Sequence, residues 1–384
     1  MRMSVIAAAL VAAIVGFGGT VAVVLSAADA LGASDAQKAS WITAMCLALA
    51  AETLVLSWRH RMPIVTAWST PGAAVLAASV GFDMSAAVGA FVIAAVAIIL
   101  TGTFSPLMRL VARIPASVSS SMLAGILAGF VIKGAQAAGV DPLLVLPLVN
   151  LFFVARLWNP AVAALVALGG GMVWAIALGL VSTAPAFAFF LPRLIAPSFS
   201  VEGLLSLALP LYLVTMTGQN LAGLAVLKAA DYNPPASELV AVTGFFSLLS
   251  APFGAHTTNL SAITAAICTG MDAHPDHSKR WLTGLWYALF YVAIALGGGY
   301  CVAVLTGLPK GLVALVAGLA LLAPLANALT IALSKESERI AAIATFVTTV
   351  SGITFFGIGA AFWGLVVGLA ILAFDGLKKS IFKA

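Results

Sequence analysis

Long apolar runs alternate with short polar or charged breaks along the whole chain. A helix that crosses the hydrocarbon core of a membrane needs about twenty mostly apolar residues, and most of these runs are that long. They are continuous and do not alternate at period two, so they predict helices and exclude a β-barrel. The pattern predicts an all-α polytopic membrane protein with about 14 membrane segments. They lie near residues 4–27, 37–58, 64–80, 84–103, 115–137, 141–157, 159–181, 200–224, 236–252, 256–270, 281–306, 309–331, 338–356 and 358–376.

Composition supports this reading of the pattern. Hydrophobic residues make up 62% of the 384 residues and charged residues only 8%, with a mean hydropathy of +1.14. That leaves too little polar surface for a water-soluble core of this size. The net charge of +5 is not gathered in a basic surface module, so we expect the lipid bilayer as a partner and no nucleic acid.

The basic residues are unevenly distributed between the two sides of the predicted spans. If the N terminus is cytoplasmic, all but four of the 18 lysines and arginines fall on the cytoplasmic side, and Lys38, Lys133, Arg193 and Lys310 fall outside. This asymmetry predicts a bacterial-type inner (plasma) membrane protein with both termini in the cytoplasm. The cytoplasmic set is Arg2, Arg59, Arg61, Arg109, Arg113, Arg156, Lys228, Lys279, Arg280, Lys335, Arg339, Lys378, Lys379 and Lys383.

The segment near 64–80 contains a polar break with a proline, Thr66-Ala67-Trp68-Ser69-Thr70-Pro71-Gly72. The apolar run after it is less than half the length of a spanning helix. We therefore expect a half-helix that starts inside the bilayer, with Pro71 in its first turn and Ser69 or Thr70 capping its free amides. Such a start presents N–H groups and a partial positive charge, which favours an anion site without a metal or another cofactor.

The second half of the chain repeats features of the first. Ile114-Pro115 precedes Leu123-Ala124-Gly125-Ile126, and Leu308-Pro309 precedes Val316-Ala317-Gly318-Leu319. At a similar offset from the first break lies a second one, Gly254-Ala255-His256-Thr257-Thr258-Asn259-Leu260-Ser261, again followed by a short apolar run. An odd number of spans per repeat requires the two copies to be inverted, and matched half-helices in inverted halves indicate a midplane transport site.

A third polar patch, Thr215-Met216-Thr217-Gly218-Gln219-Asn220, lies inside the segment near 200–224. Its amides are costly in lipid, so we expect them to face protein or a wet cavity. Gln219 and Asn220 offer uncharged donors that bind a carboxylate, or alternatively hydrogen bonds between helices.

Four strings in the chain carry a resemblance to a known family. They are Ala67-Trp68-Ser69-Thr70-Pro71-Gly72-Ala73-Ala74, Leu209-Pro210, Gln219-Asn220-Leu221-Ala222-Gly223 and the Pro234-Pro235 loop. With them, essentially the whole chain resembles the BenE family of benzoate/proton symporters.

The resemblance implies a fold and a division into domains. The family looks related to uracil, xanthine and sulfate permeases, which share a seven-plus-seven inverted repeat with core and gate domains and short strands before half-helices 3 and 10. It implies a core made of residues 1–104 (spans 1–4) and 199–307 (spans 8–11). The gate then comprises residues 105–198 (spans 5–7) and 308–384 (spans 12–14). A monomer and a homodimer formed through the gate are both compatible with this sequence.

One departure from those relatives bears on the substrate. Uracil-type permeases have carboxylates in spans 8 and 10, where this chain offers only Gln219, Asn220, His256 and Asn259. A carboxylate would repel an anionic substrate, so its absence suits an organic acid but leaves the proton carrier open.

The predicted substrate site combines the two breaks, the polar patch and one residue of span 1. For the first break the alternative is a kinked packing helix, for Trp68 a role outside the site, for Phe17 simple packing, and for His256 a structural role at a strand end. The predicted substrate-binding residues are Phe17, Trp68, Ser69, Thr70, Pro71, Gly72, Gln219, Asn220, His256, Thr257, Thr258 and Asn259.

Two residues are candidates for proton coupling. His256 lies within a span and titrates near neutral pH, and Glu52 is the only acidic residue deep in a span of the first half. Glu52 alternatively pairs with Arg59 or reaches toward the membrane surface.

These expectations lead to a secondary carrier that moves a small aromatic carboxylate, benzoate-like, inward with a proton by alternating access. No ATP-binding loop is present, so an ion gradient supplies the driving force. An exchanger or channel for an inorganic anion, or for another organic acid, is the alternative. An intramembrane enzyme is more distant, because no catalytic dyad or HExxH motif is evident. Asp272, His274, Asp276 and His277 read as a solvated turn, so we expect no metal site.

Overall fold

The computed structural model describes residues 3–181 and 191–381, and most of them are helical. Arg2 and Lys383 of the predicted cytoplasmic set lie outside these ranges. Residues 182–190 of the predicted gate segment 105–198 also lie outside them. The helices of the first half are α1 (Met3–Gly18), α2 (Val21–Ala30), α3 (Asp35–His60), α4 (Thr70–Ala77), α5 (Met84–Thr103), α6 (Ser105–Ala112), α7 (Ala116–Val140), α8 (Pro142–Trp158) and α9 (Ala163–Ala177).

The second half begins with one long interrupted helix. Its helical elements are α10 (Val201–Gly203), η1 (Leu204–Ala208), α11 (Leu209–Thr215), η2 (Met216–Asn220), α12 (Leu221–Ala229), α13 (Ala236–Ser250), η3 (Ala251–Phe253), α14 (Ile263–Thr269), η4 (His277–Lys279), α15 (Leu282–Leu296), α16 (Gly298–Thr306), α17 (Lys310–Ala320), α18 (Leu322–Ala332), η5 (Glu336–Glu338), α19 (Arg339–Val350) and α20 (Ala360–Ile381). The strands are β1 (Thr66–Trp68), β2 (Thr258–Leu260), β3 (Thr354–Phe355) and β4 (Ile358–Gly359).

Within the described ranges, 8 helical stretches are long and apolar enough to cross a membrane. The helical stretch that ends with α15 passes the same test together with α16, but the two are bent by 59° and form either a broken span or a re-entrant loop. Helices α8 and α9 are apolar but shorter. This confirms the prediction of a polytopic helical membrane protein. The eight long stretches are Met3–Ala30, Asp35–His60, Met84–Thr103, Ala116–Val140, Val201–Ala229, Ala236–Phe253, Lys310–Ala332 and Ala360–Leu377.

The two predicted breaks meet as a short antiparallel strand pair. Thr66 pairs with Leu260, Ala67 with Asn259 and Trp68 with Thr258. The ladder continues beyond both strands, because the Ser69 amide donates to the Thr257 carbonyl oxygen (3.0 Å) and the Ser261 amide to that of Val65 (3.1 Å). The backbone outside the helices is thereby hydrogen-bonded inside the protein, as a membrane interior requires. The predicted strands before both half-helices are confirmed.

Each strand leads directly into a short helix. In α4, Pro71 lies in the first turn and the Ser69 hydroxyl accepts from the Gly72 amide (3.1 Å). In α14, the Ser261 hydroxyl accepts from the Thr264 amide (3.3 Å). The Ser69 cap contributes about 1 kcal/mol to the stability of α4, whereas Ser261 lies one position before Ala262, the N-cap residue of α14. Both helix starts are therefore fixed by their own sequences.

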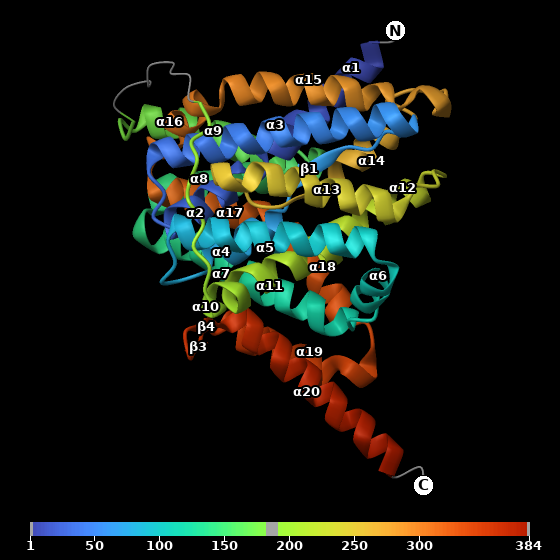
Figure 1. Ribbon diagram of the computed structural model, residues 1–384. Coiled ribbons are helices and arrows are strands. Elements are labelled where there is room, and N and C mark those ends of the chain that lie inside the picture. Colours follow the sequence, from blue (N-terminus) through green and yellow to red (C-terminus); the bar gives the residue numbers. More distant parts are fainter. Residues whose placement is uncertain (1–2, 182–190, 382–384) are drawn as a thin grey trace.

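The helices pack in two groups (Figure 1). In the first group, α15, α3, α13 and α5 lie side by side, and α1, α2, α4 and α14 pack among them. In the second group, α7 packs against α17, α18 and α19, α8 packs against α9, and α20 lies along α19 and extends away from the body toward the C terminus. These groups parallel the predicted core and gate, which stay a prediction.

Near the C terminus the structure differs from the predicted segment 338–356. Helix α19 ends at Val350, and a hairpin of β3 and β4 precedes α20. Gly352, Phe356 and Gly357 have positive φ, which ends the helix and turns the chain. The apolar side chains around these glycines hid the turn in the sequence.

The helix from Val201 to Ala229 contains two π-helical stretches, η1 and η2. In η2, the Asn220 carbonyl oxygen Oδ1 accepts from the buried Leu260 amide of β2 (3.0 Å). One turn later, a Cβ added to Gly223 would lie 2.6 Å from the Leu260 Cβ, so glycine is required for this close approach. The polar patch thus anchors the end of β2 to this helix.

We expect Asn220→Leu to destabilise the protein. The substitution keeps the volume but leaves the buried Leu260 amide without its acceptor, which costs about 1–3 kcal/mol. The midpoint of thermal unfolding in detergent measures the loss. Asn150→Leu is the matched control, because Asn150 is exposed and bonds only within its own helix. Equal stability of the two variants would contradict this role of Asn220.

Candidate functional site

A cavity of about 190 Å³ lies between the two groups of helices. On one side, its wall comes from the junction of α1 and α2, from β1 with the start of α4, from η2, and from the start of α14. On the other side, it comes from α7, α8, α9 and the junction of α17 with α18. The cavity therefore touches both halves of the sequence and both packing groups.

Both half-helix starts open onto this cavity. Thr70 and Pro71 line it from α4, and Ser261 and Thr264 line it from the start of α14. Pro71 has no amide N–H, and the Gly72 and Thr264 amides already donate to the Ser69 and Ser261 hydroxyls. The other amides at the start of a helix have no intrahelical acceptor and carry partial positive charge. The two starts are thus arranged so that one small anion can contact both.

Thr264 is a polar group that the cavity leaves without a partner. Thr264 is 2% exposed and lines the cavity, and its Oγ1 has no hydrogen-bond partner in the part of the chain that the structure describes. The neighbouring Tyr287 hydroxyl donates instead to the Thr66 carbonyl oxygen (2.8 Å). Because the Oγ1 atom is itself buried, the Thr264 side chain has to rotate before its hydroxyl can donate to a ligand in the cavity.

Trp68 forms an aromatic wall of the cavity. It is 2% exposed, and its indole Nε1 donates to the Thr20 hydroxyl (2.8 Å) at the junction of α1 and α2. Phe17 meets Trp68 edge to face, with ring centroids 5.6 Å apart, and is not itself a lining residue. The indole is therefore held rigidly, with Phe17 as its support.

Three predicted site residues form a buried network beside the cavity and do not line it. The Thr215 hydroxyl donates to the Ser69 hydroxyl (2.9 Å) and shares a 2.8 Å hydrogen bond with the Thr257 hydroxyl. The His256 ring bonds the Ser69 carbonyl oxygen through Nε2 (3.0 Å). These groups hold the first break against the second.

The bonding of His256 fixes its tautomer. The Trp41 indole N–H donates to Nδ1 (3.0 Å), so Nδ1 is the acceptor and the ring proton lies on Nε2, facing the Ser69 carbonyl oxygen. Both ring nitrogens are thus occupied within the protein. This arrangement favours a positioning role for His256 over contact with a substrate.

The remaining predicted residues also divide into those that line the cavity and those that bond only within the protein. Gln219 lines the cavity, whereas Asn220 bonds β2 and Gly72 supplies the capped amide of α4. The Thr258 hydroxyl donates to the Thr243 carbonyl oxygen (3.1 Å). Asn259 donates to the Leu260 carbonyl oxygen (2.9 Å), and its own Oδ1 is unpartnered among the described residues. The cavity thus keeps Trp68, Thr70, Pro71 and Gln219 from the predicted set.

Glu52 lies in the middle of α3, away from the cavity lining. It is 0% exposed, and neither carboxyl oxygen has a hydrogen-bond partner among the described residues. Thr258 is the polar side chain that comes close to it, and Thr258 already donates elsewhere. Burying an ionised carboxylate without a partner is very costly, so this geometry suits the neutral acid.

Sequence reasoning missed two kinds of lining residue. Ser261 is the last residue of the second break and Thr264 lies three residues after it, and their position at a half-helix start was the signal that identified their counterpart Thr70. Arg156 was assigned to a cytoplasmic loop, but it is the only charged residue that lines the cavity within the described part of the chain. An arginine inside the predicted segment 141–157 was the available signal.

The turn at Asp272 to His277 is held by its own hydrogen bonds. The Asp276 amide donates to Nδ1 of His274 (3.0 Å), and the Asp276 carboxylate accepts from Ser278. Among the described residues no group of three or more potential metal ligands is gathered. The prediction of no metal site stays a prediction.

Comparisons with known proteins now add to this geometry. The family model described as BenE, benzoate membrane transport protein, matches residues 1–374. The chain is 41% identical over 369 residues to the inner membrane protein YdcO of Escherichia coli (strain K12), covering 94% of this chain and 93% of that protein. It is 36% identical over 369 residues to the benzoate membrane transport protein of Acinetobacter baylyi, covering 96% and 94%.

Solved structures show the same fold at low sequence identity. The transmembrane domain of the cyanobacterial bicarbonate transporter BicA gives a TM-score of 0.60 at 17% identity, covering 96% of this chain and 98% of that one. SLC26A9 gives a TM-score of 0.68 at 12% identity, covering 97% of this chain and 66% of that one. These transporters have a seven-plus-seven inverted repeat, which confirms the predicted fold class, and the count of about 14 membrane segments stays a prediction.

The family match, the two relatives and the fold identify a membrane transporter and not an enzyme. The chain belongs to the BenE family of benzoate membrane transport proteins.

Proposed function

We propose that this protein carries a small aromatic carboxylate, benzoate-like, into the cell together with a proton. The observation that carries the proposal is the cavity of about 190 Å³ onto which both half-helix starts open. An apolar protein cavity of about 150 Å³ binds benzene, so this volume suits one aromatic ring. A relative that is 36% identical is named a benzoate membrane transport protein, which supports the same substrate class.

In the proposed binding mode, the carboxylate lies between the two helix starts. It accepts from the Thr264 and Thr70 hydroxyls, from the Gln219 amide and from first-turn N–H groups, and these donors remain uncharged when the site is empty. The ring lies against Trp68 and Phe152. Neutral donors together with an aromatic wall favour an organic acid over a small hydrated inorganic anion.

Transport is proposed to proceed by alternating access. The group of helices that contains α3, α4 and α14 acts as the core, and the group that contains α7 and α17 acts as the gate. Substrate bound between them is exposed to one side or the other as the core moves. The membrane is proposed to be a bacterial inner membrane with both termini cytoplasmic, in line with a relative named as an inner membrane protein.

Arg156 is proposed to attract the anion at the cytoplasmic side of the cavity. It lies in the last turn of α8 and is exposed, and no carboxylate lies within 4 Å of its guanidinium among the described residues. A positive charge beside a site otherwise lined by neutral groups raises the local concentration of anions.

Proton coupling is proposed to use Glu52. Its carboxyl is fully buried without a partner behind the strand pair, close to Thr258. It therefore has no competing role in an ion pair, whereas both ring nitrogens of His256 are occupied. Substrate movement that admits water to Glu52 releases its proton.

We expect Thr264→Val to weaken benzoate binding about tenfold. The substitution keeps the shape and removes one hydroxyl donor to a charged oxygen, worth about 1.5 kcal/mol. Calorimetric titration in detergent and uptake into proteoliposomes measure the effect. Thr330→Val is the control, because Thr330 is exposed and bonds only within its own helix. Competition for uptake by sulfate, chloride or bicarbonate, but not by benzoate, would contradict the substrate class.

Arg156→Gln is expected to raise the benzoate Kd about threefold to tenfold at low ionic strength and by less at high ionic strength. The charge acts through partly solvated space and is screened by salt. Titration at two salt concentrations tests this. Arg109→Gln, which changes an exposed arginine outside the cavity, serves as the control. A Kd that is unchanged at both salt concentrations would remove Arg156 from the site.

Glu52→Gln is expected to separate transport from the proton gradient. The variant keeps the shape of the neutral acid but has no proton to release, so exchange of labelled for unlabelled benzoate continues while accumulation driven by a pH gradient is lost. Both are measured in proteoliposomes, with Glu202→Gln, an exposed acidic residue, as the control. Full gradient-driven accumulation by the Glu52 variant would show that another group carries the proton.

A further inference from the structure

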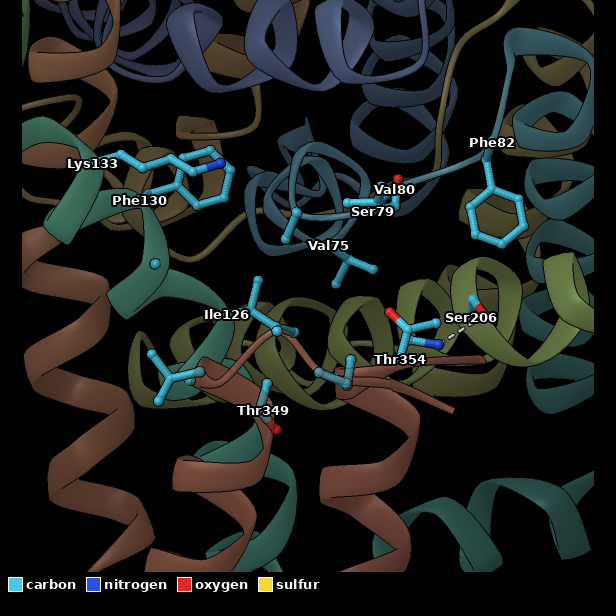
Figure 2. A pocket seen from close by; sticks show the side chains of 18 of the residues that line it. Val75, Ser79, Val80, Phe82, Ile126, Phe130, Lys133, Ser206, Thr349 and Thr354 are labelled. Atoms are coloured by element: carbon cyan, nitrogen blue, oxygen red, sulfur yellow. Dashed lines mark hydrogen bonds between the residues drawn. The ribbon is translucent and has the colours of Figure 1, made fainter. Parts of the chain in front are cut away.

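Two more cavities lie at the interface between the two helix groups, on the side away from Arg156. One, of about 600 Å³, lies between α2 and α4 on one face and α7 and α17 on the other. The second, of about 200 Å³, is shown in Figure 2, with Val75 and Ser79 on one side and Ile126 and Thr349 on the other. Phe130 and Lys133 of α7 line both.

The large cavity continues the line of the central one along the same three helices. On α4, the central cavity is lined by Pro71 and the large cavity by Ala77. On α7, the step from Leu127 to Phe130 is less than one turn. On α17, the lining passes from Ala320 to Ala317 and on to Lys310. The two cavities are therefore successive spaces along one interface.

The lining of the large cavity is positively charged. Among the residues that the structure describes, Lys38, Lys133 and Lys310 line it together with a single carboxylate, Asp29. Lys38 is paired, because its Nζ lies 2.6 Å from Asp29 and 3.4 Å from Asp35. Within the described ranges no carboxylate lies within 4 Å of the Lys133 or Lys310 ammonium groups, and both residues are exposed.

This clustering of lysines is unusual because few basic residues are predicted on the outer side of the membrane. Only four lysines and arginines were assigned to the outer side from the sequence, and three of them line this one cavity. Lys133 on α7 and Lys310 on α17 belong to the same helix group, and an anion bound in the cavity would offset the repulsion between their two ammonium groups.

We propose that this cavity, defined by Lys38, Lys133 and Lys310, is an outer vestibule that gathers an organic anion before it reaches the central site. Lys133 and Lys310 supply the attraction, and Asp29 restrains Lys38. The inference rests on the proposed inward transport of a carboxylate and on the proposed orientation. It adds a second anion-binding region to the path, distinct from the neutral donors of the central cavity.

The first test measures the KM of benzoate uptake by cells that express the full-length protein. At an ionic strength of about 0.01 M, where charges act over about 30 Å, Lys133→Gln with Lys310→Gln is expected to raise KM roughly fivefold. At about 0.15 M, where the range falls to about 8 Å, the difference shrinks. Asp29→Asn is expected to lower KM, because it removes the one negative charge of the lining. Arg193→Gln, an exposed outer arginine away from the cavity, is the control.

The second test does not depend on benzoate being the substrate. Ser26 lines the vestibule and is half-buried, so Ser26→Cys places a thiol there, in a Cys301→Ala background. Membrane-impermeant thiol reagents that differ only in charge are added outside. The anionic reagent is expected to react faster than the cationic one, and the double lysine substitution is expected to remove that preference.

The two measurements separate the possible failures. Absence of benzoate uptake by the unaltered protein, with the reagent preference intact, would overturn the proposed substrate and leave an anion vestibule. Normal uptake together with a KM that is the same in the double lysine variant and in Arg193→Gln would overturn the vestibule. An equal reaction rate for both reagents, or reaction only from the cytoplasmic side, would also overturn it.

Discussion

The antiparallel pairing of β1 with β2 is the constraint on which the rest of the structure depends. Two chain segments from opposite halves leave the helical conformation inside a membrane protein, where every exposed backbone amide and carbonyl must find a partner. The six strand residues and their extensions at Ser69 and Ser261 satisfy one another. That pairing fixes the distance between the two half-helices and thereby creates the space between their first turns.

Much of the fold was readable from the chain because its signals are long or local. Apolar runs of spanning length gave the helices, and the proline and hydroxyl residues around Pro71 gave a half-helix start that the structure confirms. The matched break near Asn259 predicted a partner for it, and the strand pair confirms this as well. Each of these signals is carried by residues that are neighbours in the sequence, so it can be interpreted before the fold is known.

The side-chain directions at the site were less predictable, because they depend on contacts between distant segments. Ser69 and Thr257 belong to the breaks, as predicted, yet Thr215 from a third segment binds both of their hydroxyls. Trp41 occupies His256 from a fourth segment. Thr264 was overlooked because an isolated threonine in an apolar run looks like packing, and only the fold turns it toward a cavity. Sequence pattern thus identified the segments of the site better than its individual contacts.

The π-helical stretch η2 shows how one additional residue in a turn is used. An α-helix advances about 100° per residue, so a single extra residue rotates everything that follows by about that angle. Gln219 consequently faces the cavity while its neighbour Asn220 faces β2 and Gly223 meets Leu260. During evolution, loss of one residue here would swing the C-terminal part of the helix out of register with β2. The number of residues in this segment, and not only its side chains, therefore sets the register of the helix against β2.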